Sequence, residues 1–281
     1  MLRSTISSLV PRATSVARHM SNAAKLTTVE INDVTGIATL TMNRPPVNGL
    51  NLELLTDLNN SIQEIEDNKS RGLILTSSNP TIFSAGLDIL EMYKPDKERL
   101  KAFWTTLQDV WLALYGSAVP TAAAINGHSP AGGCLLATSC EYRVMLPKFT
   151  IGLNETKLGI VAPKWFMSSF LSVLPRRVAE RALNQGRMFT TDEALRNGLI
   201  DEVANSKEEA LAKCAEFIGS FSKVNPLARS LTKQQLRAAE LSELENERAQ
   251  DLEKFIFFVN QPAVQKGLGI YLENLKKKSK N

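Results

Sequence analysis

The sequence predicts an α/β core followed by a helical C-terminal region. Short β-branched or apolar runs alternate with helical segments from residue 28 to residue 145, which favours parallel strands joined by right-handed crossovers. Inner runs such as residues 72–76 (GLILT) are almost wholly apolar, as expected of strands covered on both faces. After Ile151, strand patterns nearly stop and helical patterns dominate. A chain of 281 residues with 43% hydrophobic residues can form one large core with a smaller appendage.

The first half of the chain gives the clearest element boundaries. Residues 29–32 and 37–42 are predicted to be two antiparallel strands joined by the turn 33–36. Asn51 can cap the helix that follows, and the strand at 72–76 comes next. That helix presents one apolar face, formed by Leu52, Leu55, Leu58, Ile62 and Ile65.

The same unit of strand and helix recurs further along the chain. The expected elements are a helix at 97–115, a strand at 121–125, a short apolar helix at 134–138 and a strand at 142–145. In the later helical part, Thr190 and Glu193 fit a capping box, and Gly198 fits the C-cap of the same helix. No composition shift indicates a flexible linker.

The first residues differ in composition from the rest. Arg3, Arg12 and Arg18 are interspersed with serines, and no acidic residue precedes Glu30. This composition is typical of a mitochondrial transit peptide, and a plain disordered tail is the alternative. We expect residues 1–22 to be the transit peptide and the mature protein to lie in the mitochondrial matrix.

Several function classes lack the residues that they need. No run of about 18 apolar residues exists, so we expect no membrane span. The formal net charge of +4 shrinks without the arginine-rich leader, which argues against a nucleic-acid partner. Cys134, Cys140 and Cys214 lack metal-binding spacing, and His128 is the only histidine beyond the leader. We expect reduced thiols, no metal site and no Ser-His-Asp triad.

Two strand-to-helix turns are rich in small residues, at residues 83–88 (FSAGLD) and 126–134 (NGHSPAGGC). Small residues allow a ligand to approach the backbone, and a helix N-terminus offers unpaired N–H groups with partial positive charge. Two such groups aimed at one point form an oxyanion hole. The alternative is that Gly132 and Gly133 merely permit a tight turn.

Glu155 lies in a largely apolar and small-residue segment, 151–160 (IGLNETKLGI). If its carboxylate is buried, desolvation raises its pKa toward the working range of a general base. An exposed carboxylate, or one that is paired with Lys157, would instead be inert. The segment alone leaves both interpretations open.

Four motifs occur in a characteristic order and spacing. They are residues 43–45 (NRP), 83–88 (FSAGLD), 124–127 with 132–134 (AING and GGC), and the stretch 186–203. With these motifs the chain resembles the crotonase (enoyl-CoA hydratase/isomerase) superfamily. The resemblance implies an α/β fold with a β-β-α spiral core at 23–220 and a helical trimerisation region at 221–281. It also implies a homotrimer that acts on an acyl-CoA thioester, with no cofactor apart from the coenzyme A of the substrate.

Hydratases of this family carry two catalytic glutamates, and Leu135 occupies the position of the first one in this chain. Water addition needs two groups, whereas moving a double bond needs one base that removes and returns a proton. Residues 129–134 and 152–160 are similar to those of family members that convert 3-enoyl-CoA to 2-enoyl-CoA. The resemblance therefore implies a Δ3,Δ2-enoyl-CoA isomerase of fatty-acid β-oxidation, with Glu155 as the single acid and base.

By the same resemblance, the backbone N–H groups of Ala85 and Gly132 form the oxyanion hole, and Leu135 supplies apolar wall. The predicted substrate contacts come from the two small-residue turns and from the residue beside the base. They are Ala85, Gly86, Leu87, Asp88, Ile89, Gly132 and Asn154.

Other functions remain open at this point. An enoyl-CoA hydratase or a dienoyl-CoA isomerase would use a second carboxylate, and a non-catalytic RNA-binding member would need a basic surface stripe. Glu141 is the other nearby acid and is expected to start a strand, while His128 is expected to be structural. Trp104 and Trp111 share one helical face, typical of core or interface, and residues 255–259 (FIFFV) are expected to pack between subunits.

Overall fold

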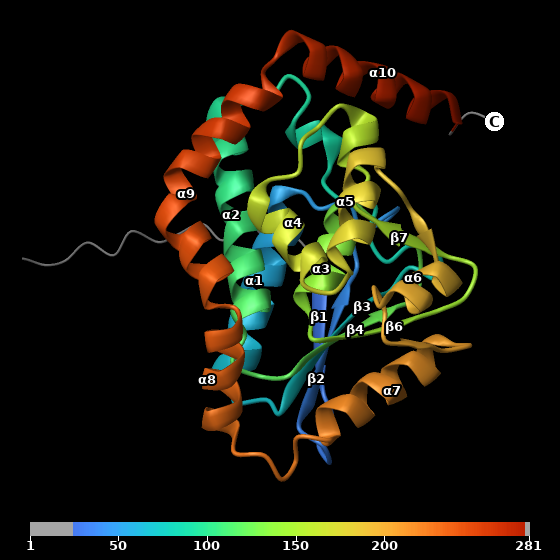
Figure 1. The fold of residues 1–281 in the computed structure, drawn as a ribbon, viewed down its shortest axis with the longest axis vertical. Coiled ribbons are helices and arrows are strands. Elements are labelled where there is room, and N and C mark those ends of the chain that lie inside the picture. The colour runs from blue at the N-terminus through green and yellow to red at the C-terminus, as the bar shows by residue number, and fades with distance from the viewer. Residues whose placement is uncertain (1–24, 279–281) are drawn as a thin grey trace, which may run out of the picture.

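The computed structural model describes residues 25–278, which form two β-sheets surrounded by helices (Figure 1). The predicted transit peptide, residues 1–22, lies outside the described residues. The strands are β1 (Thr27–Ile31), β2 (Ile37–Met42), β3 (Gly72–Ser77), β4 (Thr121–Ile125), β5 (Ser129–Pro130), β6 (Tyr142–Met145), β7 (Thr150–Gly152), β8 (Phe189–Thr190) and β9 (Glu202–Val203). The α-helices are α1 (Leu52–Asp67), α2 (Lys97–Gly116), α3 (Gly132–Ser139), α4 (Lys164–Leu171), α5 (Arg176–Gln185), α6 (Thr191–Asn197), α7 (Lys207–Gly219), α8 (Pro226–Leu236), α9 (Ala238–Val259) and α10 (Pro262–Lys278). Two short 3₁₀ helices are η1 (Ile89–Glu91) and η2 (Glu155–Leu158).

The larger sheet has the strand order β1-β2-β3-β4-β6-β9. β1 is antiparallel to β2, and every later pair of neighbours is parallel. Helices α1, α2 and α3 make the crossovers between successive parallel strands from β2 to β6. The predicted α/β class with an antiparallel start is therefore confirmed. The smaller sheet, β5-β7-β8, joins the second small-residue turn to the segment before Glu155.

Local signals in the sequence set several element ends. The Asn51 side chain accepts the Leu54 N–H at 3.0 Å and caps α1 as predicted. The capping box at Thr190 is also present, and Gly198 ends α6 in the left-handed conformation at φ +80°. β1 begins earlier than predicted, at Thr27, because this residue pairs with the last residue of β2.

Helices cover both faces of the larger sheet. α1 packs against β1 and β2 with α2 alongside it, and α7 packs on the opposite face against β3, β4 and β6 (Figure 1). The buried apolar side chains accordingly form a large cluster on the first side and a smaller one beneath α7. β3 and β4 are buried at every position. This placement explains why their sequences do not alternate between apolar and polar residues.

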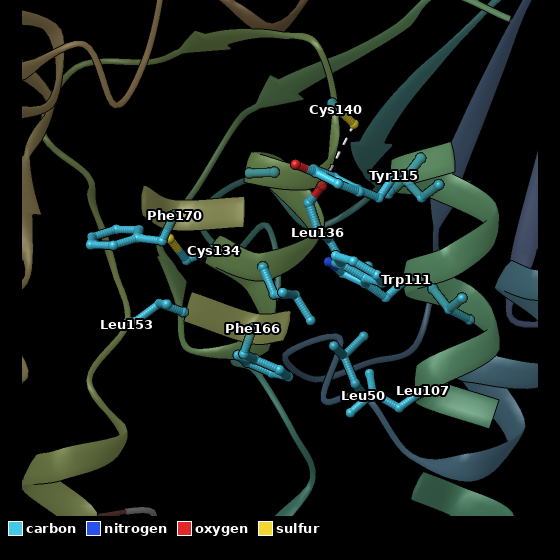
Figure 2. Close-up of a cluster of buried hydrophobic side chains, with 14 of the residues drawn as sticks. Leu50, Leu107, Trp111, Tyr115, Cys134, Leu136, Cys140, Leu153, Phe166 and Phe170 are labelled. Carbon is cyan, nitrogen blue, oxygen red and sulfur yellow. Dashed lines mark hydrogen bonds between the residues drawn. The ribbon is translucent and has the colours of Figure 1, made fainter. Parts of the chain in front are cut away.

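The short helix α3 lies at the centre of the larger cluster, and all eight of its residues are buried. Figure 2 shows its side chains enclosed by Trp111 of α2 and by Phe166 and Phe170 of α4. Cys134 in α3, Cys140 directly after it and Cys214 are free thiols, which confirms the prediction of reduced cysteines. Burial on all sides holds the N-terminus of α3, at Gly132, in a fixed position.

The C-terminal helices are fastened to this core. α9 runs along α2, and α10 crosses one end of the molecule (Figure 1). Asp251 of α9 accepts hydrogen bonds from the indole N–H groups of Trp104, at 2.7 Å, and Trp165, at 3.2 Å. Gln265 of α10 is hydrogen-bonded to the backbone of residues 92–94, just after η1. Among residues 25–278, no helix has the length and apolarity needed to cross a membrane.

Glu141 fastens α8 to the sheet. Its carboxylate accepts the Thr121 N–H at 3.0 Å and forms ion pairs with Arg229 and, at 3.1 Å, with Lys233. Burial acts to raise the pKa of this carboxyl, but Lys233 and Arg229 outweigh burial and lower it. Glu141 directly precedes β6, as predicted, and is a structural anchor.

Candidate active site

Glu155 is the first residue of η2 and is 8% exposed. Within the described structure, neither oxygen of its carboxylate has a hydrogen-bond partner. Burial raises the pKa of this carboxyl to about 7, because the charged form loses its hydration. Lys157 lies exposed, and no ion pair joins it to Glu155 in residues 25–278. Glu155 thus has the environment that the general-base interpretation requires.

The position of η2 is fixed by its own ends and by α5. The Ile160 N–H donates to the Glu155 carbonyl at 3.0 Å, and the Thr156 hydroxyl donates to the Leu183 carbonyl of α5 at 2.9 Å. Gly186, at the end of α5, lets η2 come close, because a Cβ there would lie 2.9 Å from the Thr156 hydroxyl. Gly186 therefore helps to hold Glu155 in position, although it lies outside the cavity.

A cavity of about 90 Å³ lies against Glu155 and Asn154. Among the residues that line it, Glu155 is the only acidic one. The Oδ1 atom of Asn154 is also buried without a hydrogen-bond partner in the described residues. The rest of the lining is mainly apolar and includes Ala85, Leu87, Ile89, Met92, Ala131, Phe166 and Tyr271.

The first small-residue turn presents a different N–H group from the one predicted. The Ala85 N–H donates to the Val47 carbonyl at 3.0 Å, so the prediction that it is a free oxyanion donor is wrong for this structure. Leu50 pairs with Leu87 as in a parallel sheet. The Leu50 N–H donates to the Gly86 carbonyl at 2.8 Å, and the Asp88 N–H donates to the Leu50 carbonyl at 3.0 Å. That pairing turns the Leu87 N–H to the opposite side, where it has no hydrogen-bond partner among the described residues.

The second small-residue turn supplies another free donor next to it. Gly132 is the first residue of α3, and its N–H has no partner within the described residues. A Cβ on Gly132 would lie 3.3 Å from the Leu87 nitrogen, and a Cβ on Gly86 would lie 3.1 Å from the Gly132 nitrogen. The two unpaired N–H groups are therefore neighbours, and glycine is what allows the turns to approach so closely.

Not every predicted contact residue reaches the cavity. Asp88 is committed to the turn itself, because its carboxylate pairs with Arg44 at 2.9 Å and accepts the Leu90 N–H at 3.0 Å. Gly86, at φ +86°, serves the close approach of the two turns, since a Cβ would lie 2.8 Å from that of Ala131. Among the described residues, Asp88, Gly86 and Gly132 are not part of the cavity lining, whereas Ala85, Leu87, Ile89 and Asn154 are.

Two further expectations concern residues close to α3. The ring of His128 bonds to the hydroxyl and the N–H of Thr150, at 3.0 and 3.1 Å, and so joins β5 to β7 in a structural role, as predicted. Leu135 is 1% exposed and belongs to the core. Among the described residues it is not part of the cavity lining, and its role as apolar wall of the site stays a prediction.

Aromatic residues from distant segments complete the wall, and sequence reasoning missed them as site residues. Trp104 of α2 and Phe255 of α9 stack with their ring centroids 3.5 Å apart, and Tyr271 comes from α10. The spacing of Trp104 and Trp111 indicated only a buried face. Phe255 was expected to pack between subunits, yet it is buried within this one, and Phe257 is the exposed residue of that run.

The chain is similar to known proteins over most of its length. Residues 32–281 match the family model described as enoyl-CoA hydratase/isomerase. The mitochondrial enoyl-CoA delta isomerase 1 of Mus musculus is 44% identical over 265 residues, covering 93% of this chain and 91% of the relative. The protein of the same name from Homo sapiens is 41% identical over 251 residues, with coverage of 88% and 83%.

Solved structures agree with this similarity. The crystal structure of human mitochondrial delta3-delta2-enoyl-CoA isomerase superposes with a TM-score of 0.87 at 41% identity, covering 90% of this chain and 99% of that one. An enoyl-CoA hydratase from Bacillus halodurans gives a TM-score of 0.77 at 25% identity, covering 87% and 99%. The crotonase-like fold thus carries more than one reaction, and the chain belongs to the enoyl-CoA hydratase/isomerase family.

Proposed function

We propose that this protein is a Δ3,Δ2-enoyl-CoA isomerase that converts 3-enoyl-CoA to trans-2-enoyl-CoA. The observation that carries the proposal is the single buried and unpaired carboxylate of Glu155, which faces a narrow apolar cavity. The similarity to the mouse and human enoyl-CoA delta isomerases supports the same reaction. Coenzyme A enters as part of the substrate, and no separate cofactor is needed for a proton transfer.

The reaction needs one group that moves one proton. Glu155 removes a proton from carbon 2, which leaves a dienolate whose negative charge is shared by the thioester oxygen and carbons 2 and 4. The protonated Glu155 then gives the proton to carbon 4. The double bond now lies between carbons 2 and 3, and the carbonyl is restored. A carboxyl with a pKa of about 7 suits both steps, because it is neither fully charged nor fully protonated near neutral pH.

The thioester oxygen carries much of the dienolate charge, and we assign its stabilisation to the N–H groups of Leu87 and Gly132. Both are unpaired among the described residues, and they lie side by side. Gly132 adds the partial positive charge of the α3 N-terminus. Fixed donors of this kind act without reorganisation at the moment of reaction. Asn154, beside the base, is the polar side chain that we assign to substrate contact.

The geometry favours isomerisation over hydration. Adding water calls for a second acid or base, and the position at which hydratases carry one holds Leu135, which is buried in the core. Glu141 is bound by Arg229 and Lys233, and Asp88 is bound by Arg44. Among residues 25–278, Glu155 is therefore the one acid free to act on a ligand in the cavity.

We further propose that the protein is a homotrimer in the mitochondrial matrix, with residues 1–22 removed, a core at 23–220 and a trimerising region at 221–281. Exposed leucines on α8, Leu227, Leu231 and Leu236, support an association surface there. Native mass spectrometry of protein from isolated mitochondria should give three copies of a chain that lacks residues 1–22. A full-length monomer would contradict both parts.

Glu155→Gln is expected to abolish isomerisation. The amide keeps the shape of the side chain but cannot accept the proton, so kcat should fall by about 10⁴-fold or more while KM changes little. Stopped-flow or steady-state assays with 3-hexenoyl-CoA measure both constants. Glu141→Gln is the matched control, because Glu141 is held in ion pairs away from the cavity. Activity of Glu155→Gln within about tenfold of wild type would exclude Glu155 as the base.

The raised pKa predicts opposite effects of pH on activity and on stability. kcat/KM should rise with pH up to about 7 and then level off, because Glu155 acts as a base when charged. The folded carboxyl keeps its proton to higher pH than the unfolded one, whose pKa is 4.5, so stability falls as pH rises from 4.5 to 7. Above that window the loss is about 3 kcal/mol.

Urea unfolding at pH 5 and pH 8 measures this linkage by comparing the wild type with Glu155→Gln. The variant cannot ionise, so it should exceed the wild type in unfolding free energy by about 3 kcal/mol at pH 8 and by much less at pH 5. Other titrating groups cancel in this difference. Equal differences at the two pH values would show that the pKa of Glu155 is not raised.

The oxyanion assignment predicts distinct effects for two neighbouring backbone groups. Replacing Leu87 by its α-hydroxy acid exchanges the N–H for an ester oxygen, and kcat should fall by about 10²- to 10³-fold. The same exchange at Ala85 removes the bond to Val47 and should cost about 1 kcal/mol of stability with a small effect on kcat. The reverse pattern would restore Ala85 as the oxyanion donor.

A further inference from the structure

A second, larger cavity adjoins the catalytic one. It is a groove of about 530 Å³ between α4 and α9. Five residues line both spaces, namely Trp104, Val161, Ala162, Pro163 and Phe255. These residues separate the cavity that contains Glu155 from the groove beneath α9.

The stacked rings of Trp104 and Phe255 are the aromatic part of this separation. Their planes are 9° from parallel, and Trp104 is 2% exposed. The indole N–H of Trp104 is held by Asp251, which lies one helical turn before Phe255 on the same face of α9. Trp165 packs against Trp104 in a T-shaped arrangement and also donates to Asp251. Helix α9 therefore holds both rings of the pair, because Phe255 belongs to it and Trp104 is hydrogen-bonded to its Asp251.

The sizes of the cavity and of the groove bear on the length of acyl chain that the site can take. The space beside Glu155, at about 90 Å³, is much smaller than the groove of about 530 Å³, so it leaves room for only a short acyl chain. We propose that the Trp104–Phe255 pair is the partition that restricts this enzyme to short acyl chains, and that the groove beneath α9 receives the distal end of a longer chain once the partition is reduced. This inference rests on the proposed isomerase function.

The lining of the groove suits the apolar end of an acyl group. Met167 and Phe258 face it together with the shared aromatic residues. Acidic residues outnumber basic ones in its lining, which contains Glu240, Glu243, Glu247 and Asp251 against Lys164 and Lys254. This excess of negative charge disfavours the phosphates of coenzyme A at this place. The acyl tail, and not the nucleotide part of the substrate, is therefore the occupant that fits.

The test compares kcat/KM for 3-dodecenoyl-CoA and 3-hexenoyl-CoA in the full-length protein. In the wild type, the value for the long substrate should be at least tenfold below that for the short one. Phe255→Ala should raise the ratio of long to short by at least tenfold. Phe255→Leu, which removes fewer atoms, should give an intermediate ratio and provides the measurement if the alanine variant folds poorly. An unchanged ratio in both variants, or a wild type that uses both substrates equally, would overturn the proposal.

Two further variants locate the effect. Phe258→Ala removes the same atoms from the same helix but lines only the groove, so its ratio should stay within about twofold of the wild type. Adding Met167→Trp to Phe255→Ala fills the groove and should reverse the gain for the long substrate. A gain that persists in the double variant would place the tail elsewhere. Absence of isomerisation with either substrate would instead refute the proposed function.

Discussion

A buried carboxylate without a partner is the constraint on which the rest of the site depends. A charged group in an apolar interior is unfavourable, and the protein responds by raising the pKa of Glu155 to about 7. That shift is what makes a glutamate useful as a base and as an acid at neutral pH. The surrounding packing must therefore hold η2 in place against the tendency of the carboxylate to reach water. Gly186 and Thr156 fix η2 on α5, and helices α2, α9 and α10 close the cavity.

The two backbone donors depend on the sheet in a similar way. The pairing of Leu87 with Leu50, which precedes α1, sets the direction of the Leu87 N–H group. The burial of α3 sets the direction of the Gly132 N–H group. Neither donor relies on a flexible side chain. Glycine at positions 86 and 132 allows two turns, separated by some 45 residues of sequence, to meet within van der Waals distance. The parallel sheet holds the turns in fixed positions, and the turns at its edge carry the two N–H groups.

Prediction from the sequence succeeded where the signal was local. The cap at Asn51, the capping box at Thr190 and the short helix after Gly132 need only neighbouring residues, and Glu155 was identifiable as a polar residue in an apolar segment. Neighbouring residues alone could not predict whether Ala85 or Leu87 has the free N–H group, because this depends on which of the two N–H groups bonds to the distant Val47 carbonyl. The aromatic wall was missed for the same reason. Phe255 and Tyr271 reach the cavity through tertiary packing that periodicity does not encode.

The same constraint explains how one fold can carry two reactions. A hydratase must admit water and hold a second carboxylate, and both would change the environment of the first: water would hydrate it, and a like charge nearby would shift its pKa further. In this chain, Leu135 is packed into the core, and the other nearby acids are neutralised by Arg44, Arg229 and Lys233. Glu155 is thus largely buried and has no ion-pair partner among the described residues. Under the proposed mechanism, a single base in this environment returns the proton to the substrate from which it came, and the result is a shifted double bond.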